Sequence, residues 1–365
     1  MTTKTAQRVF QDDNVLVAGR KRIEMLFDNF EEIHVSISSG KDSTVLFYLC
    51  LQEAIKRDRK IYAFFLDQEA EYENSIKVIQ KMMDHPNVIP LWYQVPLYLT
   101  NSTSYKDYFL YAWGKGETWI RDKDPIAIQE INEDYPQRFY TFFEWYEKQN
   151  PNAAYLVGLR AEEGVIRYRA VTKYVGWNGL HWSSTDKKSG VNKFYPIYDW
   201  TVYDVWKFIY EYDLPYNKIY DLMFIDNYSI YTKMRVSNLI HEKSFKCLTD
   251  LPRYEPNTYN LLCKRIQGIS TASRYASEKL VFDNKTLPKH YKTWLEFRNF
   301  LLENLEDANH RLTFINRFGK QDKNERTYKL QVGQLLINDY ENSRGFDTKK
   351  LEREEKVKEK WRAIL

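Results

Sequence analysis

Cysteine is scarce in this chain of 365 residues: it has three, Cys50, Cys247 and Cys263, and no two of them form a CxxC pair. An odd number of thiols in this pattern argues against a disulfide framework and against a four-ligand zinc site. Long apolar runs are also missing, and the first residues do not have the basic start and apolar stretch of a secretory signal. We therefore expect reduced thiols and a soluble, cytoplasmic protein without membrane contact.

A large excess of one charge is absent as well. The chain has 54 Lys and Arg against 50 Asp and Glu, a net charge of +4, so any site for an anion must be local and not surface-wide. Aromatic residues make up 16% of the chain, which is too many for a disordered protein. The length and the apolar content together predict a folded protein of about two domains.

Short β-like runs alternate with helical stretches in the first two thirds of the chain, after a helix expected at residues 14–30. Alternation of this kind predicts an α/β fold, in which helices flank a parallel sheet. Open sheets of this type bind ligands beyond the carboxyl ends of their strands. The expected strands are residues 33–38, 61–67, 88–95, 153–159 and 193–198.

Two regions depart from this alternation. Residues 99–133 are irregular and rich in Tyr, Trp and Gly, which fits a lid or binding loop and fits a surface insertion equally well. Beyond residue 230 helical patterns dominate, as in residues 289–308, and the last residues form a charge-dense helix. We therefore predict a domain at 1–230 that carries the 99–133 insertion, and a mainly helical domain at 231–365. The expected apolar face of the 289–308 helix consists of Trp294, Phe297, Leu301 and Leu305.

The stretch "HVSISSGKDSTVLFYL", residues 34–49, runs from a strand pattern through small polar residues into a helix pattern. Such a turn directs unpaired N–H groups and the positive end of the helix dipole at one spot, where phosphate binds. A Walker A loop does not fit, because Val35 stands where that motif needs Gly. The candidate donors are N–H groups beside small side chains, two hydroxyls and an ammonium: Ser38, Ser39, Gly40, Ser43, Thr44 and Lys41.

Three charged residues outside this turn are further candidates. Arg160 follows an expected strand and Arg167 lies seven residues on, so both guanidinium groups can face one anion. Alternatively, Arg167 pairs with Glu163 on the surface of a helix. Asp67 ends the second expected strand, where a carboxylate can meet a ribose hydroxyl or a metal, or can cap the next helix.

Three motifs carry a resemblance to a known family. "SSGKDS", residues 38–43, resembles the SGGKDS-type loop of the PP-loop ATP pyrophosphatase superfamily, and more narrowly that of the phosphoadenosine phosphosulfate (PAPS) reductase family, with Ser39 in place of a second Gly. "YLVGLRAEEGVIRYRA", 155–170, is similar to its Gly-x-Arg segment. "YPIYDWTVYDVWKFIYEYDLPYNKIYD", 195–221, is similar to its Pro-Ile-x-x-Trp and Leu-Pro-Tyr-Asn signature. In that last stretch Thr201 and Asp204 also predict a capped helix start.

The resemblance implies a Rossmann-like sheet of the adenine nucleotide alpha hydrolase type. It implies binding of ATP or a related adenine nucleotide, cleavage at the α phosphate with pyrophosphate release, and catalytic roles for Lys41, Asp42 and Arg160. A magnesium ion held through Asp42 or Asp67 is expected to offset the phosphate charge. The implied nucleotide contacts are Ser36, Ser38, Ser39, Gly40, Lys41, Asp42, Ser43, Thr44, Asp67, Gly158, Arg160 and Arg167.

Residues 234–248 and 269–276 resemble the branch of this family that carries an extra C-terminal domain of unknown function. Members of that branch occur beside ParB-like proteins, so the resemblance implies a ParB-like partner. Sulfur transfer or modification of a nucleic acid is the chemistry it suggests.

Two other functions stay open. One is thiol-dependent reduction of PAPS or adenylyl sulfate. The family's C-terminal catalytic cysteine segment is missing, but Cys247 has basic neighbours that lower a thiol pKa, whereas Cys50 and Cys263 are expected in the core. The other is a nucleotide-sensing or nucleic-acid-binding regulator without catalysis. Residues 311–329 interleave basic residues with Phe314 and Phe318, although a solvated helical face explains that pattern better.

Overall fold

The structure is a computed structural model that describes residues 10–104, 107–173, 175–186, 189–231, 234–241, 245–275, 286–342, 357 and 360–362. The chain divides into two compact units. The first comprises Met1–Asp67, Glu71–Val95 and Lys123–Ser237, and the second comprises Gln68–Ala70, Pro96–Asp122 and Asn238–Leu365. Residues 96–122, most of the expected insertion, therefore group with the C-terminal residues and not with the first unit.

The first unit is built on a six-stranded sheet in the order β3-β2-β1-β6-β8-β7. Neighbouring strands are parallel except β7, which runs antiparallel to β8 at the edge. Each of the five expected strands is present, and β7 is an addition that the sequence did not predict. The strands are β1 (Ile33–Ser36), β2 (Ile61–Leu66), β3 (Val88–Tyr93), β6 (Ala154–Val157), β7 (Ser183–Thr185) and β8 (Asn192–Phe194).

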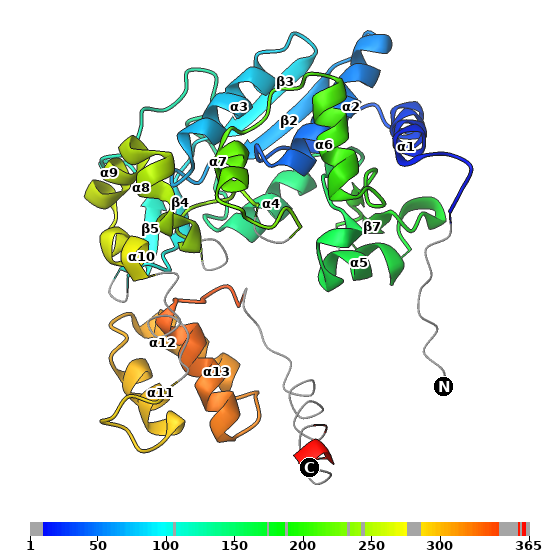
Figure 1. The fold of residues 1–365 in the computed structure, drawn as a ribbon. Coiled ribbons are helices and arrows are strands. Elements are labelled where there is room, and N and C mark those ends of the chain that lie inside the picture. The colour runs from blue at the N-terminus through cyan, green and yellow to red at the C-terminus, as the bar shows by residue number, and fades with distance from the viewer. Residues whose placement is uncertain are drawn as a thin grey trace. The chain divides into compact units, whose positions relative to one another are not determined.

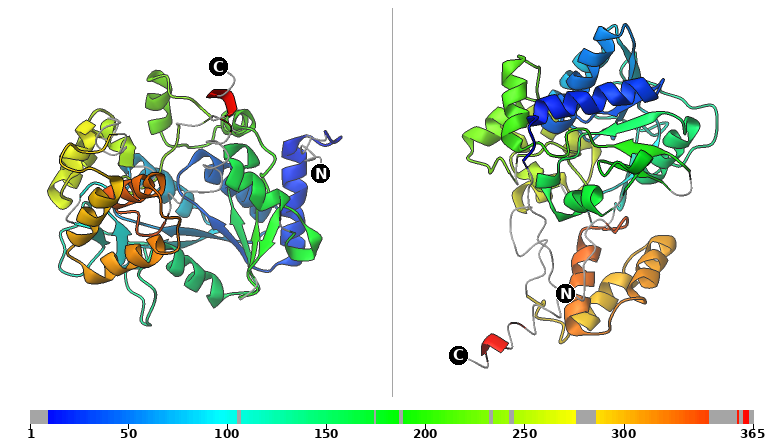
Figure 2. Two further views of the ribbon diagram at one scale, coloured as in Figure 1. Left: turned by 90° about the horizontal axis from the view of Figure 1, so that it is seen from below. Right: turned by 90° about the vertical axis from the view of Figure 1, so that its right-hand side faces the viewer.

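Helices flank this sheet, as Figures 1 and 2 show. The predicted α/β class with a parallel, Rossmann-like sheet is thereby confirmed. The helices of the first unit are α1 (Val15–Asn29), α2 (Lys41–Lys56), α3 (Glu73–Met83), α4 (Phe139–Gln149), α5 (Val165–Thr172), α6 (Val202–Glu211) and α7 (Ile219–Ile225), with short 3-10 turns η1 (Ala161–Glu163) and η2 (Trp177–Gly179).

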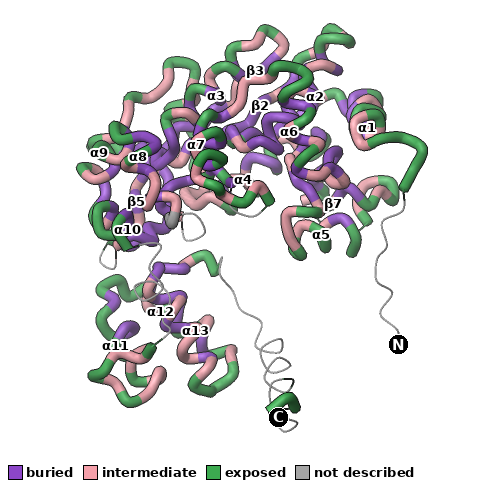
Figure 3. The backbone as a smooth tube through the Cα atoms, viewed as in Figure 1, coloured by how far each residue is buried: buried purple, intermediate pink, exposed green. Residues whose placement is uncertain are grey.

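Alternate residues of the central strands face opposite layers, and both layers are covered. Val35 and Phe65 belong to the main core, together with apolar residues of α2 and α3. On the other side Phe64 stacks on Tyr146 of α4, with ring centroids 4.1 Å apart. A strand buried on both faces reads as a nearly continuous apolar run, which is why the sequence revealed these strands. Figure 3 shows the sheet as largely buried.

Helix α6 begins with the capping box that the sequence predicted. The Thr201 hydroxyl accepts a hydrogen bond from the Asp204 N–H at 3.2 Å, and the Asp204 carboxylate accepts one from the Thr201 N–H at 2.7 Å. This exchange satisfies two N–H groups that a helix start leaves unpaired. Val205 and Ile209 of the same helix are buried, as expected.

The second unit is mainly helical, as predicted, and its described residues include an antiparallel strand pair. Its apolar core includes Leu301 and Leu305, with Trp294 and Phe297 packed against it. The helix is shorter than the expected 289–308 and ends at Glu303, so Leu305 joins this core from just beyond the helix and not from its face. The charge-dense C-terminal helix lies almost entirely outside the described residues. The elements are β4 (Leu97–Thr100), β5 (Phe109–Ala112), η3 (Phe245–Thr249), α8 (Leu251–Tyr254), α9 (Pro256–Arg265), α10 (Ile269–Tyr275), α11 (Trp294–Glu303), α12 (Ala308–Phe318) and α13 (Glu325–Leu336).

One buried carboxylate explains why residues 96–122 belong to this unit. Glu69 is fully buried and accepts hydrogen bonds from the N–H groups of Trp113 and Ile120, at 3.0 and 3.2 Å. It also pairs with Arg265 of α9 at 3.0 Å. The carboxylate thus ties the segment after β5 to the C-terminal helices.

For residues 311–329 the sequence left a nucleic-acid contact open and favoured a solvated helical face. Phe314 and Phe318 are buried in the core of the second unit, so these two rings neither lie on a solvated face nor stack on a base. Among the described residues, no helix combines the length and the apolar character that a membrane crossing requires.

Candidate functional site

The loop between β1 and α2 lies at the point of the sheet where the order of the strands reverses. From β1 the chain moves to β2 and β3 on one side, and it returns through β6 and β8 on the other. Crossovers therefore leave β1 and β6 in opposite directions, and in open α/β sheets ligands bind beyond the carboxyl ends of two such strands, a position that we call the crevice. Ser36 ends β1, Gly40 is the N-cap of α2, and Lys41 is its first residue. The loop thus occupies the position at which open α/β sheets bind ligands.

Several main-chain N–H groups of the loop are free to bind a ligand. Within the described part of the chain, the N–H groups of Ser39, Gly40, Asp42 and Ser43 have no hydrogen-bond acceptor. Ser39 adopts a positive φ of 55°, which turns the chain sharply before the helix. The start of α2 adds the positive end of a 16-residue helix dipole. Consecutive free N–H groups in such a turn form a concave site for an anion.

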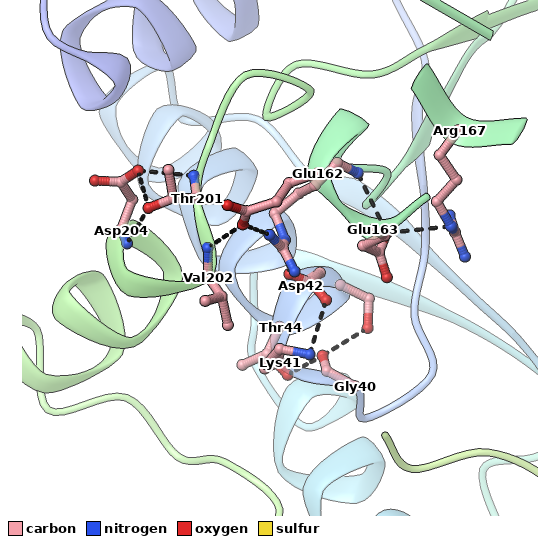
Figure 4. Close-up of polar contacts among 12 residues, drawn as sticks. Gly40, Lys41, Asp42, Thr44, Glu162, Glu163, Arg167, Thr201, Val202 and Asp204 are labelled. Carbon is pink, nitrogen blue, oxygen red and sulfur yellow. Dashed lines mark hydrogen bonds and ion pairs between the residues drawn. The ribbon is translucent and has the colours of Figure 1, made fainter. Parts of the chain in front are cut away.

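The hydroxyls of the loop brace its shape. Ser43 and Thr44 both donate to the carbonyl oxygen of Gly40, each at 3.0 Å, and the N–H of Ser38 donates to the Ser43 hydroxyl at 3.2 Å. Figure 4 shows the contact of Thr44 with Gly40. These bonds hold the Gly40 carbonyl away from the N–H groups. Direct contact of the two hydroxyls with a phosphate stays a prediction.

The charged groups of the loop are buried and paired. The Lys41 ammonium lies 3.4 Å from the Asp42 carboxylate and 3.4 Å from the carbonyl oxygen of Met234. The other Asp42 oxygen accepts from Nε of Arg160, which is only 3% exposed and also pairs with Glu162 at 3.0 Å. Figure 4 shows the Lys41–Asp42 pair. Since these four charges balance, the free N–H groups and the helix dipole supply most of the local attraction for an anion.

Gly158, at the end of β6, permits the close approach of that strand to the loop. A Cβ on Gly158 would lie 2.9 Å from the Ser43 nitrogen and 3.0 Å from the Asp42 carbonyl carbon, closer than real side chains come. The two crevice strands can therefore place the loop and Arg160 side by side only because residue 158 has no side chain. This is a physical reason for the predicted Gly-x-Arg segment.

Arg167 forms the surface pair with Glu163 that the sequence left open as an alternative to anion binding. It lies on α5, is 43% exposed in its side chain, and pairs with Glu163 at 3.2 Å, one helical turn away. Figure 4 shows this pair. Arg235 donates to the Glu163 carbonyl oxygen at 3.4 Å, so two arginines meet at η1. A role for Arg167 in binding an anion stays a prediction.

Asp67 is fully buried at the end of β2 and is engaged by its neighbours. One carboxylate oxygen accepts from Nε1 of Trp92 at 3.0 Å and from Nε2 of Gln94 at 2.9 Å. In the described residues no three His, Cys, Asp or Glu side chains gather as metal ligands. Because both oxygens of Asp42 also have cationic partners, these residues do not form a protein cage for magnesium. The predicted magnesium contacts of Asp42 and Asp67 stay predictions.

The cysteines occupy three different settings. Cys50 is buried in α2 as expected, and burial raises the pKa of its thiol. Cys247 is partly buried in η3 of the second unit. Cys263 was expected in the core, but it too is only partly buried, on α9 of the same unit, so that expectation is wrong. The use of Cys247 as a nucleophile stays a prediction.

Asn217 of the Leu-Pro-Tyr-Asn segment and Tyr220, three residues after it, reach the loop, although the sequence singled out neither residue. Asn217 is fully buried and donates to the hydroxyls of Ser75 and Ser39, at 2.9 and 3.4 Å. Tyr220 accepts a hydrogen bond from the Lys41 N–H at 3.2 Å. No local signal in the sequence marks these two residues, because Ser39 and Lys41 lie 178 and 179 residues away in the chain.

Comparisons with known proteins agree with the predicted resemblance. The family model described as "Phosphoadenosine phosphosulfate reductase domain" matches residues 32–226, more than half of the chain, and the model "Domain of unknown function (DUF3440)" matches residues 230–350. The chain is 26% identical over 310 residues to "Uncharacterized protein YbdN" of Escherichia coli, covering 80% of this chain and 76% of that protein.

Two further similarities are to named enzymes. The chain is 28% identical over 192 residues to an adenosine 5'-phosphosulfate reductase of Geobacillus thermodenitrificans, covering 52% of this chain and 68% of that protein. Among solved structures, the phosphoadenylyl-sulfate reductase of Candida auris in its phosphate complex aligns with a TM-score of 0.35 at 15% identity, covering 60% of this chain and 94% of that one.

Proposed function

We propose, from the premise that the chain belongs to the phosphoadenosine phosphosulfate reductase domain family, that it binds ATP or a related adenine nucleotide and cleaves it at the α phosphate. The loop of residues 38–44 holds the departing pyrophosphate. The observation that carries the proposal is the set of N–H groups at Ser39, Gly40, Asp42 and Ser43 that have no hydrogen-bond acceptor within the described part of the chain.

Hydrogen bonds from these four N–H groups are strong enough for specific binding of a phosphate. Hydrogen bonds to a charged group contribute roughly 1.5 to 3 kcal/mol each, so four of them reach the ~8 kcal/mol of a micromolar complex. The buried Lys41 ammonium also contributes: when the anion binds, it pairs with a phosphate oxygen in place of the Asp42 carboxylate. Arg160 keeps the Asp42 carboxylate neutralised while this exchange takes place.

The chemistry is transfer of the adenylyl group. A nucleophile of the second substrate attacks the α phosphorus, a bond to the α phosphate forms, and the bond to the bridging oxygen breaks. Pyrophosphate leaves with that electron pair, and the loop N–H groups and Lys41 stabilise the charge that develops on it. In this scheme the protein side chains position the nucleotide and polarise its phosphates, and none forms a covalent intermediate. Magnesium enters with the nucleotide, and no step depends on a protein-held ion.

The second substrate follows from the resemblance alone. Sulfur transfer or modification of a nucleic acid, with a ParB-like protein as partner, is part of the proposal. The C-terminal residues matched by the domain of unknown function are the region we expect that partner to need.

Nucleotide binding and turnover are tested separately. Calorimetric titration with the non-cleavable analogue α,β-methylene-ATP and magnesium compares the wild type with Lys41→Ala and with Lys56→Ala, an exposed lysine at the far end of the same helix. We expect Lys41→Ala to weaken binding about 10- to 100-fold, as loss of a charged hydrogen bond does, and Lys56→Ala to bind like the wild type.

Turnover is then measured as pyrophosphate released from ATP, with and without a ParB-like protein. Release that Lys41→Ala abolishes and Lys56→Ala retains supports the proposal. Absence of analogue binding to the wild type, or release that survives Lys41→Ala, would contradict it. Tight binding with no release in either arm would favour a nucleotide-sensing regulator.

A further inference from the structure

Tyr220 places a buried hydroxyl beside the loop. It belongs to α7, is 2% exposed, and its ring packs edge-on against Trp206 with centroids 5.2 Å apart. The Lys41 ammonium lies 5.6 Å from the centre of the same ring. A side chain fixed on two sides in this way holds its hydroxyl in one position.

The hydrogen of this hydroxyl is unused. A phenolic hydroxyl has one hydrogen to donate and two lone pairs that accept. The Tyr220 oxygen accepts from the Lys41 N–H at 3.2 Å, and the Val236 N–H also faces it. Among the residues that the structure describes, no acceptor takes the hydroxyl hydrogen. A buried donor without an acceptor is costly, which points to a ligand that completes it.

Gly40 lies close to the Tyr220 hydroxyl and has no side chain of its own to separate a ligand from it. A Cβ built on Gly40 would lie 3.3 Å from the Ser38 hydroxyl oxygen and 3.9 Å from the hydroxyl oxygens of both Ser43 and Tyr220. The backbone angles of Gly40, φ −68° and ψ 145°, suit any residue, so the conformation does not require glycine. What glycine provides here is a backbone without a side chain, which a phosphate oxygen can approach between three hydroxyls; we call this place the opening.

We infer that Tyr220 donates its hydroxyl hydrogen to a phosphate oxygen bound at this opening, and that it is a nucleotide-binding residue of the loop. The inference rests on the proposed function and adds a contact that the three family motifs do not assign. The Lys41 N–H polarises the hydroxyl toward donation, so the two act as one relay to the anion. Burial raises the pKa of Tyr220, so the hydrogen is present throughout the neutral range.

The first test is Tyr220→Phe, with Tyr216→Phe as its matched control. Tyr216 lies four residues earlier in the chain, and its hydroxyl donates to Asp221 at 2.8 Å and not to the loop. Calorimetric titration uses pyrophosphate and α,β-methylene-ATP as probes. We expect Tyr220→Phe to weaken both about 10- to 100-fold, which is the cost of one lost hydrogen bond to a charged group, and Tyr216→Phe to stay within about twofold of the wild type.

Unchanged binding of pyrophosphate to Tyr220→Phe would overturn the inference. Tighter binding would overturn it as well, because it would mean that the tyrosine oxygen competes with phosphate for the Lys41 N–H. The proposed function fails separately, if wild-type protein binds neither probe. If the wild type binds and Lys41→Ala does not, while Tyr220→Phe matches the wild type, only the role of Tyr220 fails.

A second variant covers the case in which Tyr220→Phe does not fold. Gly40→Ala puts a methyl group into the opening on a backbone that accepts alanine, and thermal unfolding checks its stability. We expect it to lose pyrophosphate binding. Pyrophosphate binding that survives Gly40→Ala would place the phosphate elsewhere and overturn the inference.

Discussion

The buried pair of Arg160 and Asp42 offers a prediction whose size follows from the structure. Replacing Arg160 with Met keeps the length of the side chain but removes its charge. Asp42 then faces the crevice with Lys41, 3.4 Å away, as its remaining cationic partner. Removing one member of a buried pair costs about 3 to 5 kcal/mol of unfolding free energy. Because Asp42 is 12% exposed in its side chain and retains Lys41, we expect about 3 kcal/mol, the lower end of that range.

The companion variant Asp42→Asn should cost less. Arg160 retains Glu162 at 3.0 Å, and the amide oxygen of Asn still accepts from it, so the loss is roughly 1 kcal/mol. The double variant removes the uncompensated carboxylate and should be more stable than Arg160→Met alone by roughly 1 to 2 kcal/mol. A favourable coupling of this size is expected only if the two groups meet in the folded protein.

Urea titration followed by tryptophan fluorescence measures all four chains of this cycle. The midpoints are compared at a common slope, because a change in slope would mean that the unfolded or folded state itself has changed. An Arg160→Met midpoint equal to that of the wild type would refute the pairing. So would a double variant whose loss is the sum of the two single losses.

Three other predictions concern Gly158, His34 and Cys247. Gly158→Ala forces a Cβ to within 2.9 Å of the Ser43 nitrogen, so it should lower the melting temperature and abolish pyrophosphate binding; normal binding by calorimetry would contradict this. Burial is the main cause that lowers the pKa of His34 below its ordinary 6.5, so the unfolded chain binds more protons below pH 6.5 and acid destabilises the protein. The urea midpoint of His34→Gln should therefore fall less than the wild-type midpoint between pH 7 and about 5. Midpoints that fall equally with pH in both proteins would show that His34 does not titrate in this way. Cys247→Ser should leave pyrophosphate release from ATP unchanged, whereas loss of release together with loss of sulfite formation from PAPS would establish the thiol-dependent reaction.

The sheet was predictable from the sequence because its signal is local. Strands buried on both faces, such as β1 and β2, give apolar runs that a window of a few residues reveals. The loop was predictable for the same reason, since its small residues, its lysine and the following helix are contiguous. Strand β7 was missed because "SST" carries no apolar pattern and forms only by pairing with β8.

The partners within the site could not be read from the sequence. Arg160 and Asp42 are 118 residues apart in the chain, and Tyr220 and Lys41 are 179 apart. Contacts of that separation depend on how the sheet is ordered, and no local pattern encodes them. The same applies to Glu69, whose contact with Arg265 spans 196 residues and joins residues 96–122 to the C-terminal helices. A sequence pattern can propose residues for a site, but the pairing of their charges comes from the fold.

Binding of a polyphosphate by the loop N–H groups underlies both the proposed function and the role of Tyr220. The direct measurement is a two-dimensional NMR titration of protein labelled with 15N in serine, glycine and aspartate, to which pyrophosphate is added. We predict saturable downfield amide proton shifts at Ser39, Gly40, Asp42 and Ser43, and none of these in Lys41→Ala at the same concentrations. Pyrophosphate that saturates the protein while these four amides stay unshifted would contradict it.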